Sequence, residues 1–180
     1  MSLDPTSPQP IEPDTKDWTW VIETACPECG FDAAGLALTD VPALIRTNAA
    51  AWPAVLARPD VRIRPAADTW SALEYGCHVR DACRVFADRL TLMLTQDDPL
   101  FANWDQDEAA EQGRYGEQDP AQVAADLQRA ADGVAAGFAD VRGEQWHRTG
   151  RRSNGSVFTV QTLARYFVHD PVHHLHDVAG

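Results

Sequence analysis

A chain of 180 residues, of which 44% are hydrophobic, is long enough for one domain with a sizeable core and an additional arm. Its formal net charge of -12 argues against nucleic acid and anionic membrane surfaces as partners, because both would repel an acidic protein. Since no apolar run approaches the roughly 20 residues that span a bilayer, and the N-terminus lacks the basic and apolar regions of a signal peptide, we expect a cytoplasmic protein.

Residues 1–37 are predicted to form an arm that precedes the main domain. Residues 1–17 are rich in Pro and Asp and show no apolar period, which is typical of a loose segment. Residues 18–22, Trp-Thr-Trp-Val-Ile, alternate well enough for a short strand or an extended segment that packs on the body.

Cys26-Pro-Glu-Cys29 is followed by Gly30 and therefore predicts a turn. A Cys-x-x-Cys turn is also what a zinc knuckle or a redox loop offers. A structural zinc ion needs four ligands and the sequence has no second Cys-x-x-Cys, so a structural turn with free thiols is the simpler interpretation, with a metal or redox role as the alternative. In a cytoplasmic protein the four cysteines are better explained as reduced thiols, metal ligands or buried small side chains than as disulfides.

Residues 38–180 contain the start signals of four helices. Each start combines a capping residue with an apolar period of helical type. The starts lie at Asp40, at Ser71 in the capping box Ser71-Ala-Leu-Glu74, at Asp119, and at either Ser156 or Thr159. With no convincing sheet beside them, these helices predict an all-α protein, a four-helix bundle that forms one domain behind the arm.

A long acidic connection, residues 96–118, separates the second predicted helix from the third. Connections of this length inside a compact domain are commonly lids over a functional site. The acidity of the segment is explained more simply by solubility, so a lid and an ordinary surface loop are both open interpretations.

Four of the six histidines fall within residues 166–177 at the C-terminal end. His169, His173 and His176 are spaced i, i+4, i+7, so a helix would place them in one line. Two imidazoles four residues apart can bind one metal ion, whereas His169 and His174 would lie about 140° apart around the helix. The alternatives are a solvated tail, a residual tag or a favourable charge at the helix C-terminus, although these histidines are interrupted in a way that a tag is not.

Glu74, His78 and Asp81 follow the same spacing on the second predicted helix, between apolar positions. The line either faces solvent or points into a polar pocket of the bundle, and the absence of Lys and Arg from it slightly favours the pocket. His78, with His169 and His173, would supply three nitrogen ligands and leave a coordination position for water or substrate, as catalytic metal sites do. Glu74 or Asp81 could accept a hydrogen bond from His78 and fix its tautomer, with plain surface charge as the alternative.

Two segments carry a resemblance to a known family: Trp70-Ser-Ala-Leu-Glu-Tyr-Gly-Cys-His78 at the start of a long helix, and His169-Asp-Pro-Val-His173-His-Leu near the C-terminus. Together they resemble the DinB-like superfamily, the group that includes the YfiT-like proteins and the N-terminal domain of the mycothiol-dependent maleylpyruvate isomerase. The resemblance covers about residues 38–178. It implies a four-helix bundle of up-down-down-up order that holds a divalent ion, zinc or nickel, through His78, His169 and His173.

Characterised members of this group include thiol-dependent transferases, isomerases and hydrolases. The resemblance therefore implies a metal-dependent enzyme for a small molecule, with a low-molecular-weight thiol, mycothiol in particular, as a further cofactor or substrate. The alternatives are a non-enzymatic metal-binding or stress-response module and a thiol-redox protein that uses Cys26 and Cys29. His176 beside the ligand pair is a further candidate of the site, and a homodimer is expected where apolar helix faces are exposed.

Overall fold

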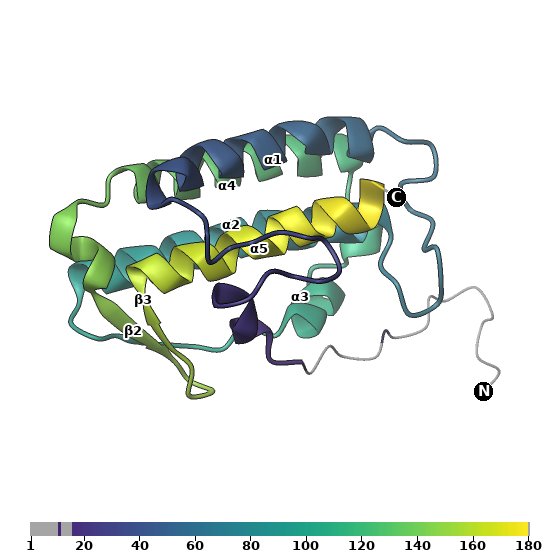
Figure 1. Cartoon of the computed structure of the whole chain (residues 1–180). Coiled ribbons are helices and arrows are strands. Elements are labelled where there is room, and N and C mark those ends of the chain that lie inside the picture. Colours follow the sequence, from purple (N-terminus) through teal and green to yellow (C-terminus); the bar gives the residue numbers. More distant parts are fainter. Residues whose placement is uncertain (1–10, 12–15, 180) are drawn as a thin grey trace, which may run out of the picture.

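The computed structural model describes residue 11 and residues 16–179, and its main body is a bundle of four long helices (Figure 1). These are α1 (Val41–Leu56), α2 (Ala72–Thr95), α4 (Pro120–Ala139) and α5 (Val160–Ala179). Both α4 and α5 pack against α1 and against α2, so that α1 and α2 lie across the bundle from each other. The predicted helical bundle is therefore confirmed.

Three of the four helix starts have the capping hydrogen bonds that the sequence predicts, whereas the side chain of Asp40, before α1, makes none. At α2 the Ser71 side chain accepts a hydrogen bond from the Glu74 backbone N–H, and Glu74 Oε2 accepts one from the Ser71 backbone N–H at 2.8 Å. At α4 the Asp119 side chain accepts from the backbone N–H of Gln122 at 2.8 Å. At α5 the cap is Thr159, whose Oγ1 accepts from the backbone N–H of Thr162 at 3.1 Å. Each side chain satisfies an N–H group that the helix leaves unpaired.

Large side chains from all four helices fill the centre of the bundle. The largest with almost no exposed surface include Trp52, Leu73, Leu127, Phe138, Leu163 and Phe167. Burying a side chain of this size stabilises the fold by about 1.5–3 kcal/mol relative to leaving it exposed. On α5, the apolar residues that face this core determine how the helix is rotated about its axis.

Pro171 lies inside α5 without ending it. A proline removes one backbone N–H donor from a helix and usually bends it. Here the carbonyl oxygen of Pro171 accepts a hydrogen bond from Nδ2 of the buried Asn48 at 2.8 Å, and Asn48 Oδ1 accepts another from Trp52 Nε1 at 3.2 Å. The contact fastens the middle of α5 to α1, next to the histidines of α5.

A small sheet lies at one end of the bundle, which corrects the prediction that no sheet is present. It consists of β1 (Leu100–Phe101), β2 (Thr149–Arg152) and β3 (Val157–Thr159), with β1 parallel and β3 antiparallel to β2. Strands of two to four residues are too short for an alternating apolar pattern to be visible in the sequence. The connection 96–118 also contains a helix of its own, α3 (Gln106–Gln112).

The described part of the predicted arm, residues 16–37, runs along α5 (Figure 1). Residues Trp18–Ile22 form a 3-10 helix, η1, that packs against α5, so the predicted strand or extended segment is wrong while the contact with the body is present. Residues 1–10 and 12–15 of the predicted loose segment lie outside the described residues. The division of the chain at residue 38 stays a prediction.

Among the helices of the described part, none combines the length and the apolar character needed to cross a bilayer.

Candidate metal centre

Around Pro171, helix α5 carries two overlapping pairs of residues spaced by four: His169 with His173, and Asp170 with His174. Residues four apart share a helix face, while consecutive residues differ by about 100° around the axis. The two pairs therefore point to two neighbouring faces of α5. One face meets the N-terminal arm and the other meets α2.

Each face forms a cluster of side chains whose candidate ligand atoms lie within 4.8 Å of one another. The arm cluster consists of Cys26, Cys29, His169 and His173. The bundle cluster consists of His78, Asp170 and His174.

The structure does not bring the predicted ligand set His78, His169 and His173 into one cluster. His169 and His173 do lie together, with ring centroids 5.1 Å apart, as their spacing predicts. The residues of α5 that meet His78 are instead Asp170 and His174. Helical spacing defines which residues share a face, but it does not define which face turns toward α2. Metal binding by His169 and His173 stays a prediction.

In the bundle cluster, His78 is completely buried in the middle of α2. Its Nε2 lies 3.2 Å from Asp170 Oδ2, and His174 Nε2 lies 3.8 Å from the same oxygen. Two further buried atoms, His78 Nδ1 and Asp170 Oδ1, have no hydrogen-bond partner among the described residues. An unsatisfied buried polar atom costs about 1–3 kcal/mol. Two imidazoles and a carboxylate form a donor set that fits a divalent cation, and such an ion would give Asp170 Oδ1 a partner.

Neighbouring groups hold the bundle cluster in place. His174 Nδ1 lies 3.0 Å from Asp177 Oδ2, so a proton on Nδ1 leaves Nε2 unprotonated on the side of Asp170. The ring of His78 stacks on Trp104 at a centroid distance of 5.2 Å and contacts Trp70 at 5.3 Å. These contacts orient both imidazoles before any ligand arrives.

Asp170 is the charged member of the bundle cluster. Burial raises the pKa of its carboxyl, but the imidazoles of His78 and His174 outweigh burial and lower the pKa to about 2. The group is therefore an ionised carboxylate, the form that binds a cation. Burial also raises the pKa of Asp177, and the hydrogen bond to His174 is the main effect that lowers it below its ordinary value.

In the arm cluster, Cys26 Sγ lies 3.7 Å from His173 Nδ1, although the two residues are far apart in the sequence. Cys26, His169 and His173 are buried and Cys29 is partly buried. Burial lowers the pKa of His169 to about 4 and also lowers that of His173, so both imidazoles are neutral, as metal ligands must be. Burial raises the pKa of the Cys29 thiol.

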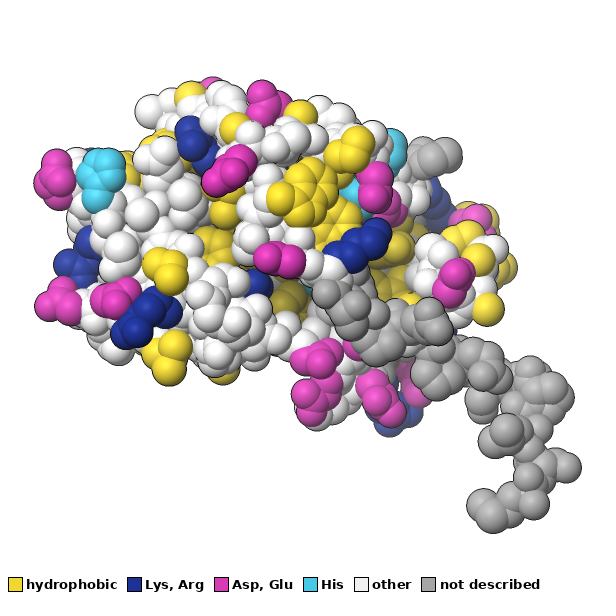
Figure 2. Space-filling model, turned by 60° about the horizontal axis from the view of Figure 1, so that its bottom comes forward, with side chains coloured by type: hydrophobic (Ala, Val, Ile, Leu, Met, Phe, Trp, Pro, Cys, Tyr) yellow, Lys and Arg dark blue, Asp and Glu magenta, His cyan; other side chains and the backbone are white. Residues whose placement is uncertain are grey.

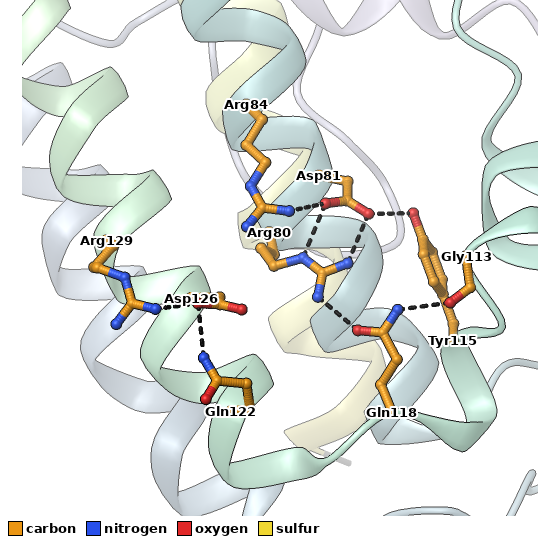
Figure 3. Close-up of polar contacts among 9 residues, drawn as sticks. All are labelled: Arg80, Asp81, Arg84, Gly113, Tyr115, Gln118, Gln122, Asp126 and Arg129. Atoms are coloured by element: carbon orange, nitrogen blue, oxygen red, sulfur yellow. Dashed lines mark hydrogen bonds and ion pairs between the residues drawn. The ribbon is translucent and has the colours of Figure 1, made fainter.

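The residues predicted to support His78 have other partners. Glu74 is buried and bonds Arg64 and Ser71, which places it in the cap of α2. Asp81 accepts hydrogen bonds from Arg80, Arg84 and the hydroxyl of Tyr115, the last at 2.7 Å (Figure 3). His176 is exposed and belongs to neither cluster. In the structure, the carboxylates that face the histidines of α5 include Asp170, Asp177 and Glu28.

Asp170, His174 and Asp177 are site residues that sequence reasoning missed. A signal for the first two was present, because Asp170 and His174 have the same spacing of four as His169 and His173. A carboxylate on a helix near the C-terminus is more often solvated, and only its distance to His78 shows its place in the cluster.

Both clusters border one pocket of about 260 Å³. Its lining includes His169, Asp170, His173 and His174 from α5, with aromatic walls from Trp18, Trp70, Tyr75 and Tyr166. The connection 96–118 contributes Gln106 and Asp107, so this segment forms part of the site. On the face that carries η1 and α3, Figure 2 shows apolar side chains interspersed with acidic ones.

Comparisons with known proteins agree with this architecture. Residues 30–178 match the family model of the DinB superfamily. The structure resembles that of YfiT from Bacillus subtilis, which is described as a probable metal-dependent hydrolase with an unusual four-helix bundle topology. The two structures have a TM-score of 0.63 and 20% sequence identity, and the match covers 79% of this chain and 81% of that chain. At this identity the likeness shows the fold. None of the curated proteins compared with the chain matches it in sequence. Because the family match covers most of its length, the chain belongs to the DinB superfamily.

Proposed function

We propose that the protein is a divalent-metal-dependent enzyme that acts on a small molecule, with the metal held by His78, Asp170 and His174. The observation that carries the proposal is the convergence of these three side chains from α2 and α5 beside a pocket, with a buried oxygen of Asp170 that has no partner among the described residues. Membership of the DinB superfamily and the likeness to a probable metal-dependent hydrolase support the same assignment.

Three protein ligands leave coordination positions free, which is typical of a catalytic metal site. The chemistry that a divalent cation supplies when bound is Lewis-acid activation of water and of a carbonyl group. Zinc and nickel are the ions proposed, since imidazole suits both and a carboxylate is tolerated by both.

Side chains in and around the pocket prepare the site in three ways. Asp177 holds His174 through Nδ1, so the unprotonated Nε2 is the atom that would bind the cation. Trp70 and Trp104 pack on His78 and keep water away from its ring. Burial raises the pKa of Tyr75 to about 12, so its hydroxyl stays protonated and can donate a hydrogen bond to a substrate.

The charge of the pocket restricts its substrates. The carboxylates of Asp68, Asp107, Asp170 and Asp177 line it, which is more negative charge than one divalent cation neutralises, and no Lys or Arg lines it among the described residues. A neutral or cationic substrate therefore suits the site better than an anion. The pocket volume of about 260 Å³ lies near the lower end of the range for small-molecule sites.

Hydrolysis is the reaction that we propose. Transfer or addition of a low-molecular-weight thiol such as mycothiol is the second candidate, because a cation with a free coordination position can also bind and stabilise a thiolate.

The proposal also includes the up-down-down-up order of the helices. It is supported by Figure 1, where α1 and α5 run in one direction and α2 and α4 in the other. A cytoplasmic location and a homodimer stay predictions.

The test uses the full chain after chelation and reloading with zinc or nickel. Activity toward a panel of small esters, amides and thiol acceptors should depend on the added metal. The variants His78→Ala, Asp170→Asn and His174→Ala should each lower metal affinity by roughly 100-fold or more, because even the partners around the ligands contribute 10–100-fold. His176→Ala is the matched control, since this histidine lies on the same helix and is exposed.

Unchanged metal affinity in all three ligand variants would contradict the assignment of the site. Metal binding without activity toward any substrate of the panel would favour the non-enzymatic metal-binding module instead.

A further inference from the structure

We propose that Cys26, Cys29, His169 and His173 bind a second metal ion, zinc, in a closed site that fastens the N-terminal arm to α5. The juxtaposition that carries the proposal is a Cys-x-x-Cys turn of the arm packed on a His-x-x-x-His face of the last helix. The inference does not rest on the proposed function, because the two sites share no ligand.

The distances within the arm cluster suit one ion. All four candidate ligand atoms lie within 4.8 Å of one another, and Cys26 Sγ is 3.7 Å from His173 Nδ1. Tetrahedral zinc with bond lengths of about 2.0–2.3 Å separates its ligand atoms by about 3.3–3.8 Å. The cluster is therefore close to the geometry of a bound ion, and a small contraction completes it.

A buried nitrogen of His169 without a partner among the described residues supports a ligand at this histidine. His169 is 5% exposed, and its Nε2 is buried with no hydrogen-bond partner among the described residues. Buried polar atoms in folded proteins are almost always paired. A bond to a metal ion supplies the partner that the protein does not.

Backbone hydrogen bonds fix the conformation of the turn that carries the two thiols. The backbone N–H of Cys26 donates to the Phe31 carbonyl at 2.9 Å, and the N–H of Gly30 donates to the Cys26 carbonyl at 2.8 Å. Gly30 adopts a φ of 74°, which a residue with a Cβ rarely adopts, so the turn closes directly behind Cys29. This short, hydrogen-bonded turn brings both sulfur atoms toward α5.

Two carboxylates orient His173. Its Nε2 faces Glu28 Oε2 at 3.5 Å and Asp177 Oδ1 at 3.7 Å. Negative charge on that side favours a proton on Nε2 and leaves Nδ1, the atom next to Cys26, free to bind a metal. Glu28 belongs to the same turn as the cysteines, so the turn supplies two ligands and also supports a third.

The donor set identifies both the ion and the type of site. Two thiolates and two imidazoles form the set that binds zinc in structural sites, and four protein ligands leave no position for a substrate. The family match begins at residue 30, so Cys26 and Cys29 lie just outside it. The arm cluster therefore combines two ligands from the family domain with two from the arm.

The consequence of a closed zinc site is a fixed wall of the pocket. The ring of Trp18 contacts the rings of His169 and His173, with centroid distances of 5.7 and 5.3 Å, and Trp18 lines the pocket. Binding of the arm to α5 thus keeps Trp18 in the wall of the pocket that both clusters border.

Cobalt(II) substitution tests the site, because a thiolate bound to cobalt gives a charge-transfer absorption that the bundle cluster, which has no thiol, cannot produce. We expect this absorption in the wild-type chain and in the double variant His78→Ala/His174→Ala. It should be lost in Cys26→Ser/Cys29→Ser and in His169→Ala/His173→Ala. Cys77→Ser is the matched control, since this buried thiol of α2 belongs to neither cluster. Zinc content, measured on protein purified under reducing conditions, should fall by one ion per chain in the same two variants.

Circular dichroism checks that the variants fold, and Cys29→His, which keeps a zinc ligand, should retain zinc. A cobalt-loaded wild-type chain without thiolate absorption would overturn the proposal. So would full zinc retention in Cys26→Ser/Cys29→Ser, or recovery of Cys26 and Cys29 as a disulfide from protein handled with reductant. If the wild-type chain binds metal at the arm cluster but not at the bundle cluster, the proposed function is contradicted and this inference stands.

Discussion

His173 and His174 are consecutive residues of α5 whose ring centroids lie 5.7 Å apart at 82°, and they belong to different clusters. Asp177 connects them, because its Oδ2 lies 3.0 Å from His174 Nδ1 and its Oδ1 lies 3.7 Å from His173 Nε2. One carboxylate therefore orients an imidazole of each cluster. Two neighbouring metal sites on one helix would in this way share a supporting group.

Asp177→Asn should weaken metal binding at both clusters. An amide is neutral and stabilises the proton on the facing imidazole nitrogen less well, so we expect a loss of roughly 10–100-fold in affinity. Competition with a chromogenic chelator measures it, with Asp88→Asn on the exposed side of α2 as the control. Equal affinities in both variants would show that Asp177 orients neither histidine.

Glu74→Gln should change stability and leave metal binding as it is. The carboxylate bonds Arg64 and Ser71 at the start of α2, and hydrogen bonds to a charged group contribute about 1.5–3 kcal/mol. We therefore expect the free energy of unfolding in urea to fall by about 1–3 kcal/mol. Glu117→Gln, at an exposed carboxylate, is the control. A drop in metal affinity with Glu74→Gln would restore the role that the sequence suggested for it.

The metal-free protein should lose stability as the pH falls from about 6.5 to about 4. Burial lowers the pKa of His169 from 6.5 to about 4, so in this range the unfolded chain binds a proton that the folded chain does not. The contribution is complete above pH 6.5 and is lost toward pH 4, and His173, whose pKa is also lowered, adds to it. Urea unfolding in the presence of a chelator at a series of pH values measures how the free energy of unfolding changes with pH. His169→Gln/His173→Gln should flatten the curve, and an equally steep curve in that variant would contradict the assignment.

Trp18→Ala should make the arm cluster easier to strip of metal. The ring covers His169 and His173, and each aromatic pair of this kind contributes about 0.5–1.5 kcal/mol beyond burial, so removing the ring should speed metal release several-fold. Stopped-flow mixing with a chelator measures the rate. Trp20→Ala is the comparison, because this more exposed ring stacks on Trp18 instead. If both variants released metal at the wild-type rate, Trp18 would not be a cover of the site.

Much of the fold could be predicted from local signals. Capping at Ser71 and Asp119 and the apolar periods behind them depend on residues within one or two turns, and the structure places the helices there. The small sheet could not be predicted, because its strands are too short to carry a period and pair across long stretches of chain. The turn at Cys26 and Cys29 was predicted as a turn, without its partner.

The sequence by itself determined that His169 and His173 share a helix face and that Cys26 and Cys29 share a turn, since both follow from distances along the chain of three or four residues. Only the tertiary structure decided that these two pairs meet and that His78 faces Asp170 and His174 instead. The physical reason is that the spacing of residues defines angles within a helix, whereas the direction of each face in space is set by burial of the opposite, apolar side in the core. A rotation of α5 by about 100°, the step of one residue, changes which pair meets α2.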